Sequence, residues 1–108
     1  MTPQRGELWR VRLDRTPASE TKKIRPCLVV GSDVLNQRRH TIVVVPLSTG
    51  PQAAPPLAVP VHGAGRSAVA VTDQIRAAAR ERFIRRVGKL SEPDLAAVEE
   101  GLRAVLEL

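Results

Sequence analysis

Before residue 91, the chain alternates short apolar runs with breaks made of Pro, Gly and polar residues. Eight of its nine prolines and six of its seven glycines lie in this part and leave little room there for a long uninterrupted helix. The runs have the length and residue types of strands, and five or six are expected within residues 6–14, 25–30, 41–47, 57–61, 67–71 and 84–90. Many short strands joined by turns are typical of a small barrel.

The first run, GELWRVRLD, shows a clear alternation. Trp9, Val11 and Leu13 fall on one face, and Arg10 and Arg12 fall on the other. This pattern predicts a half-buried strand with a basic outer face. By contrast, the run TIVVVPL is apolar throughout, which indicates a strand buried on both faces.

The segments between the runs have turn chemistry. Residues 14–24 are polar and are expected to form a loop, and Pro26 is expected at the start or on an edge of its strand. The segment GSDVLNQRR favours one helical turn capped by Ser32 or Asp33. HGAGR fits a hairpin turn, and DQIRAAARERF is expected to be a strand end that leads into a short helical turn.

The last segment predicts a helix. Ser91 can cap it, Pro93 fits its first turn, and Asp94 completes a Ser-x-x-Asp box. Apolar residues then recur at helical spacing on one face, namely Leu95, Val98, Leu102, Val105 and Leu106. The whole is expected to be mainly β with a C-terminal helix (α+β), a small and partly open β-barrel in a single domain over residues 1–108.

Composition excludes several classes of protein. The 108 residues suffice for one core, and no apolar run reaches the roughly 20 residues of a membrane span. The N-terminus lacks a secretory h-region, so a cytoplasmic protein is expected. The single cysteine, Cys27, rules out an internal disulfide, and neither His40 nor His62 has acidic or Cys neighbours. We therefore expect no metal and no cofactor.

Charge is unevenly distributed along the chain. Residues 1–90 carry 16 basic and 6 acidic side chains, a net charge of +10. Residues 91–108 carry 1 basic and 5 acidic side chains, a net charge of −4. A basic body of this kind suits a polyanion, either nucleic acid or an acidic protein, although it is also compatible with a merely soluble basic protein. With only Trp9 and Phe83 as aromatic residues, a base-stacking platform is not expected.

Arg25 stands where the polar loop enters a strand. Its planar guanidinium matches phosphate oxygens and keeps its charge at ordinary pH. Ser48 and Thr49 close the neighbouring apolar strand, and a hydroxyl there is placed to reach the same rim of the barrel. An arginine and a hydroxyl on one rim form a minimal phosphate-handling pair, although Ser-Thr at a strand end also fits ordinary turn chemistry.

The order of several segments resembles the MazF/PemK family of bacterial toxins. They are RGELWRVRLD, SETKKIRPCLVV, TIVVVPLST, VAVTDQIR and VGKLSEPDLAAVEEGLRAVL, which together cover about residues 4–108. The resemblance implies an SH3-like barrel that forms a homodimer and cleaves single-stranded RNA, often mRNA, at short sequence motifs without a metal. It also implies a cyclic phosphate and a 5′-hydroxyl as products, and inhibition of translation and growth.

The resemblance also implies residue roles. The family's catalytic arginine matches Arg25, and its catalytic threonine matches Ser48, where this chain departs from the pattern. Thr49 lies one residue late and is the alternative source of the hydroxyl. Lys22 and Lys23 are expected to hold the RNA backbone.

Two further residues follow from the segment DQIR and from the basic residues after it. Gln74 is expected at a base edge, and Arg76 is expected at a phosphate or at the dimer seam. Arg80, Arg82, Arg85 and Arg86 are candidates to extend the basic track, although most of them fit a solvated surface equally well. The implied protein partner is a MazE-like antitoxin whose acidic tail competes with RNA for this surface.

Two other interpretations stay open at this point. A CcdB-type toxin shares the fold class and poisons DNA gyrase without catalysis, and it does not require Arg25 with a strand-end hydroxyl. An inactive member that folds and binds antitoxin is the third possibility, because Ser48 departs from the commonest pattern.

Overall fold

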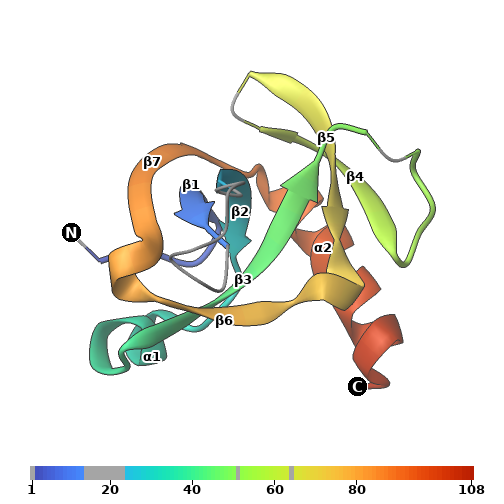
Figure 1. Ribbon diagram of the computed structural model, residues 1–108. Coiled ribbons are helices and arrows are strands. Elements are labelled where there is room, and N and C mark those ends of the chain that lie inside the picture. The colour runs from blue at the N-terminus through green and yellow to red at the C-terminus, as the bar shows by residue number, and fades with distance from the viewer. Residues whose placement is uncertain (1, 14–23, 51, 64) are drawn as a thin grey trace.

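The computed structural model describes residues 2–13, 24–50, 52–63 and 65–108. Among them lie seven strands and two α-helices (Figure 1). The strands are β1 Glu7–Arg12, β2 Ile24–Val29, β3 Thr41–Ser48, β4 Ala58–Gly63, β5 Arg66–Val71, β6 Arg76–Ala79 and β7 Phe83–Lys89. The helices are α1 Asp33–Arg38 and α2 Glu92–Leu106, and two short 3-10 turns are η1 Thr72–Gln74 and η2 Arg80–Arg82.

All strands join one antiparallel sheet in the order β4-β5-β3-β2-β1-β7, with β6 paired to β3 off this path. Strand β3 is the centre of the fold because it pairs with three strands. It pairs with β2 along one edge, and with β6 and then β5 along the other. Figure 1 shows β3 running across the molecule between β6 and the β4–β5 hairpin, with α2 behind the sheet. The expected curled, mainly β fold with a C-terminal helix is confirmed.

The sheet buries two separate clusters, one on each face. The cluster beneath α2 includes Leu8, Leu28, Val45, Val61 and Val98, all fully buried. The cluster on the other face contains Trp9, Val11, Cys27, Val29, Ile42, Val44 and Ala78. The alternation of side chains along β1 and the uniform apolar run of β3 supply residues to both clusters.

The segment after residue 75 departs from expectation. The strand residues Arg76–Ala79 do lead into a short helical turn, η2, but they form a separate strand, β6, which lies between two 3-10 turns and pairs with Thr41–Val44 of β3. The free edge of β3 decides this, because its unpaired backbone groups would otherwise be buried without partners. The expected five or six strands thus become seven in the described chain.

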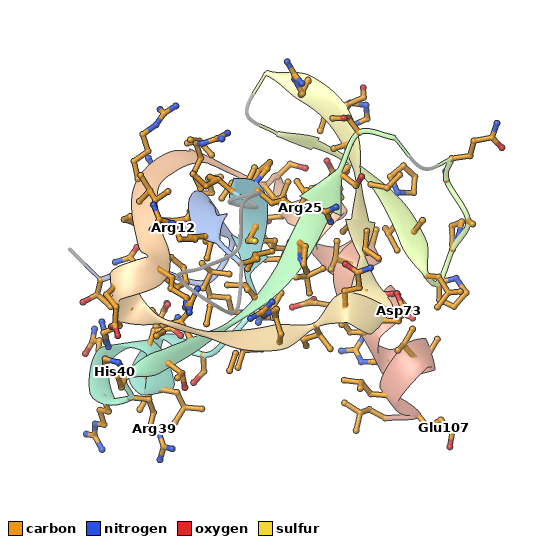
Figure 2. All side chains as sticks on the ribbon, in the orientation of Figure 1. Arg12, Arg25, Arg39, His40, Asp73 and Glu107 are labelled. Atoms are coloured by element: carbon orange, nitrogen blue, oxygen red, sulfur yellow. The ribbon has the colours of Figure 1, made fainter. Side chains whose placement is uncertain are left out.

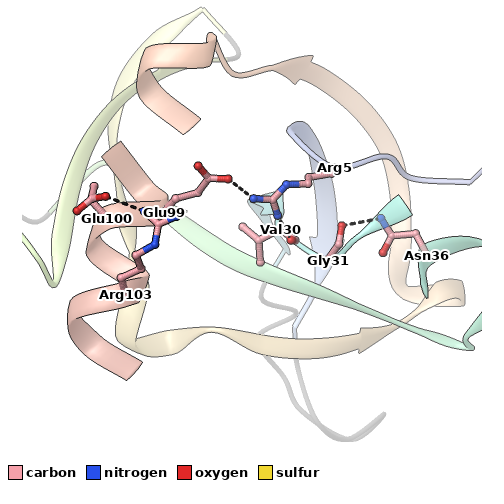
Figure 3. A network of polar contacts seen from close by, with 7 residues as sticks. All are labelled: Arg5, Val30, Gly31, Asn36, Glu99, Glu100 and Arg103. Carbon is pink, nitrogen blue, oxygen red and sulfur yellow. Dashed lines mark hydrogen bonds and ion pairs between the residues drawn. The ribbon is translucent and has the colours of Figure 1, made fainter. Parts of the chain in front are cut away.

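Helix α2 begins at the predicted cap Ser91, and of the two candidates for α1, Ser32 and Asp33, Ser32 is the cap. The backbone N–H of Leu35 donates to Ser32 Oγ (3.3 Å), and that of Asp94 donates to Ser91 Oγ (3.2 Å). Arg5 then links α2 to the sheet, because its guanidinium binds both the Glu99 carboxylate and the Val30 carbonyl (Figure 3). None of the helices in the described chain is long and apolar enough to span a bilayer.

Candidate functional site

The candidate site opens where strands β2 and β3 separate. Their ladder covers Val29↔Val44, Leu28↔Val45 and Cys27↔Pro46, although both strands continue beyond the last pair. The N–H of Val30 donates to the Val43 carbonyl (3.0 Å), and hydrogen-bonded pairs recur at every second residue of an antiparallel ladder. The next such pair after Leu28–Val45 would need an N–H at Pro26, and proline has none.

Arg25 and Ser48 lie on the two sides of this opening. Counting on from Cys27↔Pro46, they occupy the positions that would face each other if the ladder continued. Side chains of opposed residues share a face of the sheet, and successive residues alternate. Ser48, the last residue of β3, therefore shares its face with Arg25, whereas Thr49 lies beyond the end of the strand. The Ser48 hydroxyl also accepts from the backbone N–H of Gly50 (3.4 Å).

A cleft of about 730 Å³ occupies the opening. Its lining residues come from β1, β2 and β7, from the end of β3 and from the β4–β5 hairpin. Its lining residues are Arg10, Arg25, Pro26, Leu47, Ser48, Thr49, Gly63, Arg66, Ala68, Arg85, Arg86 and Val87. Five of these are arginines, and no described lining residue is acidic. The cleft is thus a cationic site with a partly apolar floor.

The cleft arginines differ in how far their charge is neutralised. Arg86 Nε forms an ion pair with the Glu7 carboxylate at 2.8 Å. Burial raises the pKa of Glu7, but hydrogen bonds from Trp9 and from the Gln4 backbone, together with Arg86, outweigh this and lower it. Within the described residues, the other four cleft arginines have no acidic partner; they are Arg10, Arg25, Arg66 and Arg85.

Cys27 lies directly behind Arg25 in the buried part of β2. Burial raises the pKa of its thiol to about 12, against the smaller opposing effect of the Arg76 and Arg25 guanidiniums. The thiol is fully buried and donates weakly to the Arg25 carbonyl at 3.7 Å. It is a core residue, as expected from its place inside a strand, and not a nucleophile.

Gln74 and Arg76 line a second hollow of about 490 Å³ with Leu13, Pro46, Ile75 and Ala77. By register, Arg76 lies opposite Val44 and therefore shares the sheet face of Arg25 and Ser48. Its guanidinium donates to the Leu13 carbonyl at 3.2 Å. The expected base and phosphate contacts at these two residues stay predictions.

The remaining basic residues proposed from the sequence differ in whether they line the cleft. Lys22 and Lys23 lie outside the described residues. Arg85 and Arg86 line the cleft, but Arg80 donates to carbonyls at the end of α1, away from the opening. Arg82 likewise does not line the cleft in the described chain and donates to the Arg12 carbonyl at 3.4 Å.

Sequence reasoning missed two lining arginines as site residues. Arg10 was visible only as part of the basic outer face of its strand. No sequence pattern marked Arg66 as a site residue, because only the fold brings the β4–β5 hairpin beside β2. Histidine, cysteine and acidic side chains of the described ranges nowhere gather in groups of three or more that could hold a metal ion.

The sequence of residues 4–106 matches the family described as PemK-like, MazF-like toxin of type II toxin-antitoxin system. The chain belongs to this family. Among curated relatives of this MazF-family toxin, endoribonuclease MazF9 of Mycobacterium tuberculosis is 34% identical, with 97% of each chain covered. Endoribonuclease EndoA of Bacillus subtilis is 27% identical over 100% of this chain and 97% of its own. The expected class of enzyme, an endoribonuclease, agrees with both.

Solved structures agree with the fold of this toxin. MazF of Deinococcus radiodurans superimposes with a TM-score of 0.85 at 22% identity, covering 100% of this chain and 99% of its own. A MazE-MazF structure from the same organism gives 0.86 at 22% identity, covering 100% and 98%. A mycobacterial endoribonuclease in complex with its cognate antitoxin gives 0.83 at 20% identity, covering 98% and 96%.

Proposed function

We propose that this toxin is a metal-independent, sequence-specific endoribonuclease that cleaves single-stranded RNA, mRNA included, and so inhibits translation and growth. The observation that carries the proposal is the placement of Arg25 and Ser48 on one sheet face, on either side of a cationic cleft. The described lining offers no carboxylate, imidazole or thiol, which are the usual ligands of a catalytic metal. It offers guanidiniums and hydroxyls, which suit a phosphodiester.

The reaction uses a nucleophile that the substrate itself provides. The ribose 2′-oxygen attacks the adjacent phosphorus, an O2′–P bond forms, and the P–O5′ bond breaks. The 2′-hydroxyl loses its proton to solvent and the departing 5′-oxygen gains one, which leaves a cyclic phosphate and a 5′-hydroxyl. Because the nucleophile is the 2′-hydroxyl, the same chemistry does not cleave DNA.

Arg25 and Ser48 act on the charge that develops during this step. Negative charge builds on the phosphoryl oxygens, and a fixed guanidinium stabilises it most when it is already positioned before the reaction. Arg25 is held by a strand, which fixes its backbone, and Ser48 can donate its hydroxyl hydrogen from across the opening. Arginine cannot accept a proton in a protein at ordinary pH, so Arg25 acts as an electrostatic stabiliser and not as a base.

The proposal includes two protein partners. One is a second copy of the chain, in the homodimer implied by the family. The other is a MazE-like antitoxin with an acidic tail, because acidic side chains would compete with RNA for a cleft lined by five arginines. Structural relatives of this fold include a MazE-MazF complex from Deinococcus radiodurans.

The test is cleavage of a long single-stranded RNA with and without EDTA, by wild type, Arg25→Ala and Arg38→Ala. Arg38 is an exposed arginine on α1 that does not line the cleft, so it controls for the lost charge. We expect discrete, EDTA-resistant cuts by wild type and Arg38→Ala, mapped by primer extension, and a loss of at least about 100-fold in Arg25→Ala. Thermal melting should be alike in all three.

Three outcomes would contradict the proposal. Cuts that vanish with EDTA would show that the reaction needs a metal. Arg25→Ala protein that loses its fold along with activity would make Arg25 a structural residue. The absence of any cut by wild type would favour a CcdB-like gyrase poison, to be examined by a supercoiling assay, or an inactive member that only binds antitoxin.

A further inference from the structure

Two of the cleft arginines face each other directly across neighbouring strands. Arg10 of β1 pairs with Arg85 of β7, so their side chains leave the same face of the sheet. Opposed residues of an antiparallel pair have Cβ atoms roughly 5 Å apart, and like charges at this spacing repel. Arg10 is half-buried and Arg85 is exposed, and neither has an acidic partner within the described residues.

The next residue along β7, Arg86, is an arginine whose charge is neutralised. Arg86 is held by the Glu7 carboxylate at 2.8 Å, whereas Arg85 has no such group. Arg66, from the β4–β5 hairpin, adds a third guanidinium to the same cleft. Between them the floor is apolar, formed by Pro26, Leu47, Ala68 and Val87. A repelling pair above an apolar floor is suited to a ligand that is anionic at one end and flat and apolar at the other.

The position of the Arg10–Arg85 pair relative to Arg25 limits which class of ligand can contact both. Arg10 lies opposite Pro26, the residue next to Arg25 in β2, and Arg85 lies one strand further on. The pair therefore leaves the sheet face opposite to that of Arg25, although all three arginines line the one cleft. With strands about 5 Å apart, the pair is one to two strand spacings from the backbone of Arg25. A ligand that reaches both places carries anionic groups repeated along its length, as a nucleic acid strand does.

We propose that Arg10 and Arg85 together clamp a backbone phosphate of the bound strand that flanks the phosphate held by Arg25. The two non-bridging oxygens of a phosphodiester can each accept from one guanidinium, which removes the repulsion between the pair. The adjoining base lies over the apolar floor. This inference rests on the proposed function in one respect, namely that Arg25 holds the scissile phosphate. The clamp itself reads phosphate and not the 2′-hydroxyl, so it holds single-stranded DNA as well.

Single-stranded DNA is therefore the probe for the clamp, because it binds and is not cleaved. Binding of a mixed-sequence DNA oligonucleotide is measured across a salt series for wild type, Arg10→Gln/Arg85→Gln and Arg38→Gln/Arg39→Gln. The last variant loses the same charge from the last residue of α1 and from its C-cap Arg39, which lies far from Arg25 (Figure 2), and neither residue lines the cleft. On single strands each phosphate contact contributes about 0.7 to the slope of log K against log salt.

The cleft variant should lose about 0.7 of that slope, the contribution of one phosphate, and at least about tenfold in affinity at low salt. The α1 variant should keep the wild-type slope. Arg10→Lys/Arg85→Lys should recover most of the slope, because the charge returns without the paired geometry. Removal of the repelling pair should leave the melting temperature of Arg10→Gln/Arg85→Gln at or above that of wild type.

An equal loss of slope in both double variants would overturn the clamp, because the effect would then be one of net charge. A large fall in melting temperature would also overturn it and make the pair structural. RNA cleavage separates this proposal from the previous one. Unchanged DNA binding and KM in the cleft variant, with Arg25-dependent cleavage intact, would refute the clamp alone. Wild type that binds DNA through the pair and cuts no RNA would refute the nuclease alone.

Discussion

Pro26 stands at the position from which β2 would donate its next backbone hydrogen bond to the carbonyl of Leu47. Because proline has no N–H, the ladder between β2 and β3 ends one residue earlier, at Cys27↔Pro46. The missing hydrogen faces β3 and not β1, so the pairing of Pro26 with Arg10 is kept. A single residue type thus lets two central strands separate and leaves Arg25 and Ser48 at the opening.

Replacement of Pro26 by alanine should therefore restore the ladder and narrow the cleft. We expect cleavage to fall about tenfold or more, while the free energy of unfolding changes by no more than about 1 kcal/mol. A new hydrogen bond adds about 0.5–1.5 kcal/mol, and the loss of proline removes about 0.4–1 kcal/mol by making the unfolded chain freer. Amide exchange measured by NMR should show a protected N–H at the new alanine.

Pro60→Ala is the matched control for this change. Pro60 is exposed on β4, which is an edge strand of the sheet, so its replacement restores no ladder between central strands. Activity of Pro60→Ala should stay within about twofold of wild type. An unprotected amide at residue 26, together with full activity, would show that Pro26 does not keep the strands apart.

The hydroxyl of Ser48, and not that of Thr49, should support cleavage. Ser48 is the last residue of β3 and shares the sheet face of Arg25 by register, whereas Thr49 follows the end of the strand. Loss of one hydrogen-bond donor to a developing charge costs about 100-fold or more in kcat, so Ser48→Ala should fall by that order. Thr49→Ala should change kcat less than about threefold. Single-turnover cleavage measures both, and the reverse ranking would assign the role to Thr49.

The sequence predicts most of the elements but not the way they meet. Helix α2 is predictable because its cap, first-turn proline and apolar spacing all agree, and they are local signals. Strand β6 is not, because Ala77, Ala78 and Ala79 carry little preference for a strand. Its conformation comes from the edge of β3, more than thirty positions earlier in the chain.

The same limit applies to the candidate site. Arg25 and Ser48 can be named from a family resemblance, but their shared face depends on the register between two strands that are distant in sequence. Whether the backbone nitrogen of residue 26 faces β3 or β1 depends on the register of that ladder, and no local sequence pattern reveals it. Arg66 enters the site only because the hairpin folds over the sheet. The arrangement of the site residues therefore depends on pairing between distant strands, which local sequence patterns do not reveal.

Glu7 should make the fold sensitive to acid. Although burial raises the pKa of this carboxyl, hydrogen bonds from Trp9 and Gln4 and the Arg86 ion pair lower it below 4.5 overall. A lowered pKa in the folded state gives stability that is present above the unfolded pKa and is lost as pH falls through the folded one. Wild type should therefore lose more stability than Glu7→Gln between about pH 6 and about pH 3.

Urea unfolding at a series of pH values measures this difference. At neutral pH Glu7→Gln should be less stable by about 1–3 kcal/mol, since it removes a charged acceptor of three hydrogen bonds. The two curves should converge in acid. Glu100→Gln is a suitable control, because its carboxylate is exposed and pairs only with Arg103 on the surface of α2. Parallel curves for wild type and Glu7→Gln would contradict the assignment.

Cys27 should be chemically silent although two guanidiniums lie near it. Burial raises the pKa of its thiol to about 12, which outweighs the opposing effect of Arg76 and Arg25. At about pH 8 the thiolate is then too scarce, and the buried sulfur too inaccessible, for alkylation. Mass spectrometry should find no iodoacetamide adduct on the folded protein and complete labelling in concentrated guanidinium chloride. Rapid labelling of the folded protein would show a thiolate activated by the arginines.

The same burial predicts how stability depends on alkaline pH. A thiol whose pKa is raised in the folded state favours folding below its unfolded pKa of about 9, and this contribution declines as the pH rises towards 12. Cys27→Ala lacks the titrating group, so its free energy of unfolding should fall less than that of wild type between about pH 8 and about pH 11. At pH 8 the variant should keep cleavage within about twofold, because the sulfur touches only the Arg25 carbonyl and the core. A large loss of cleavage at unchanged stability would mean that Cys27 positions Arg25 for the reaction.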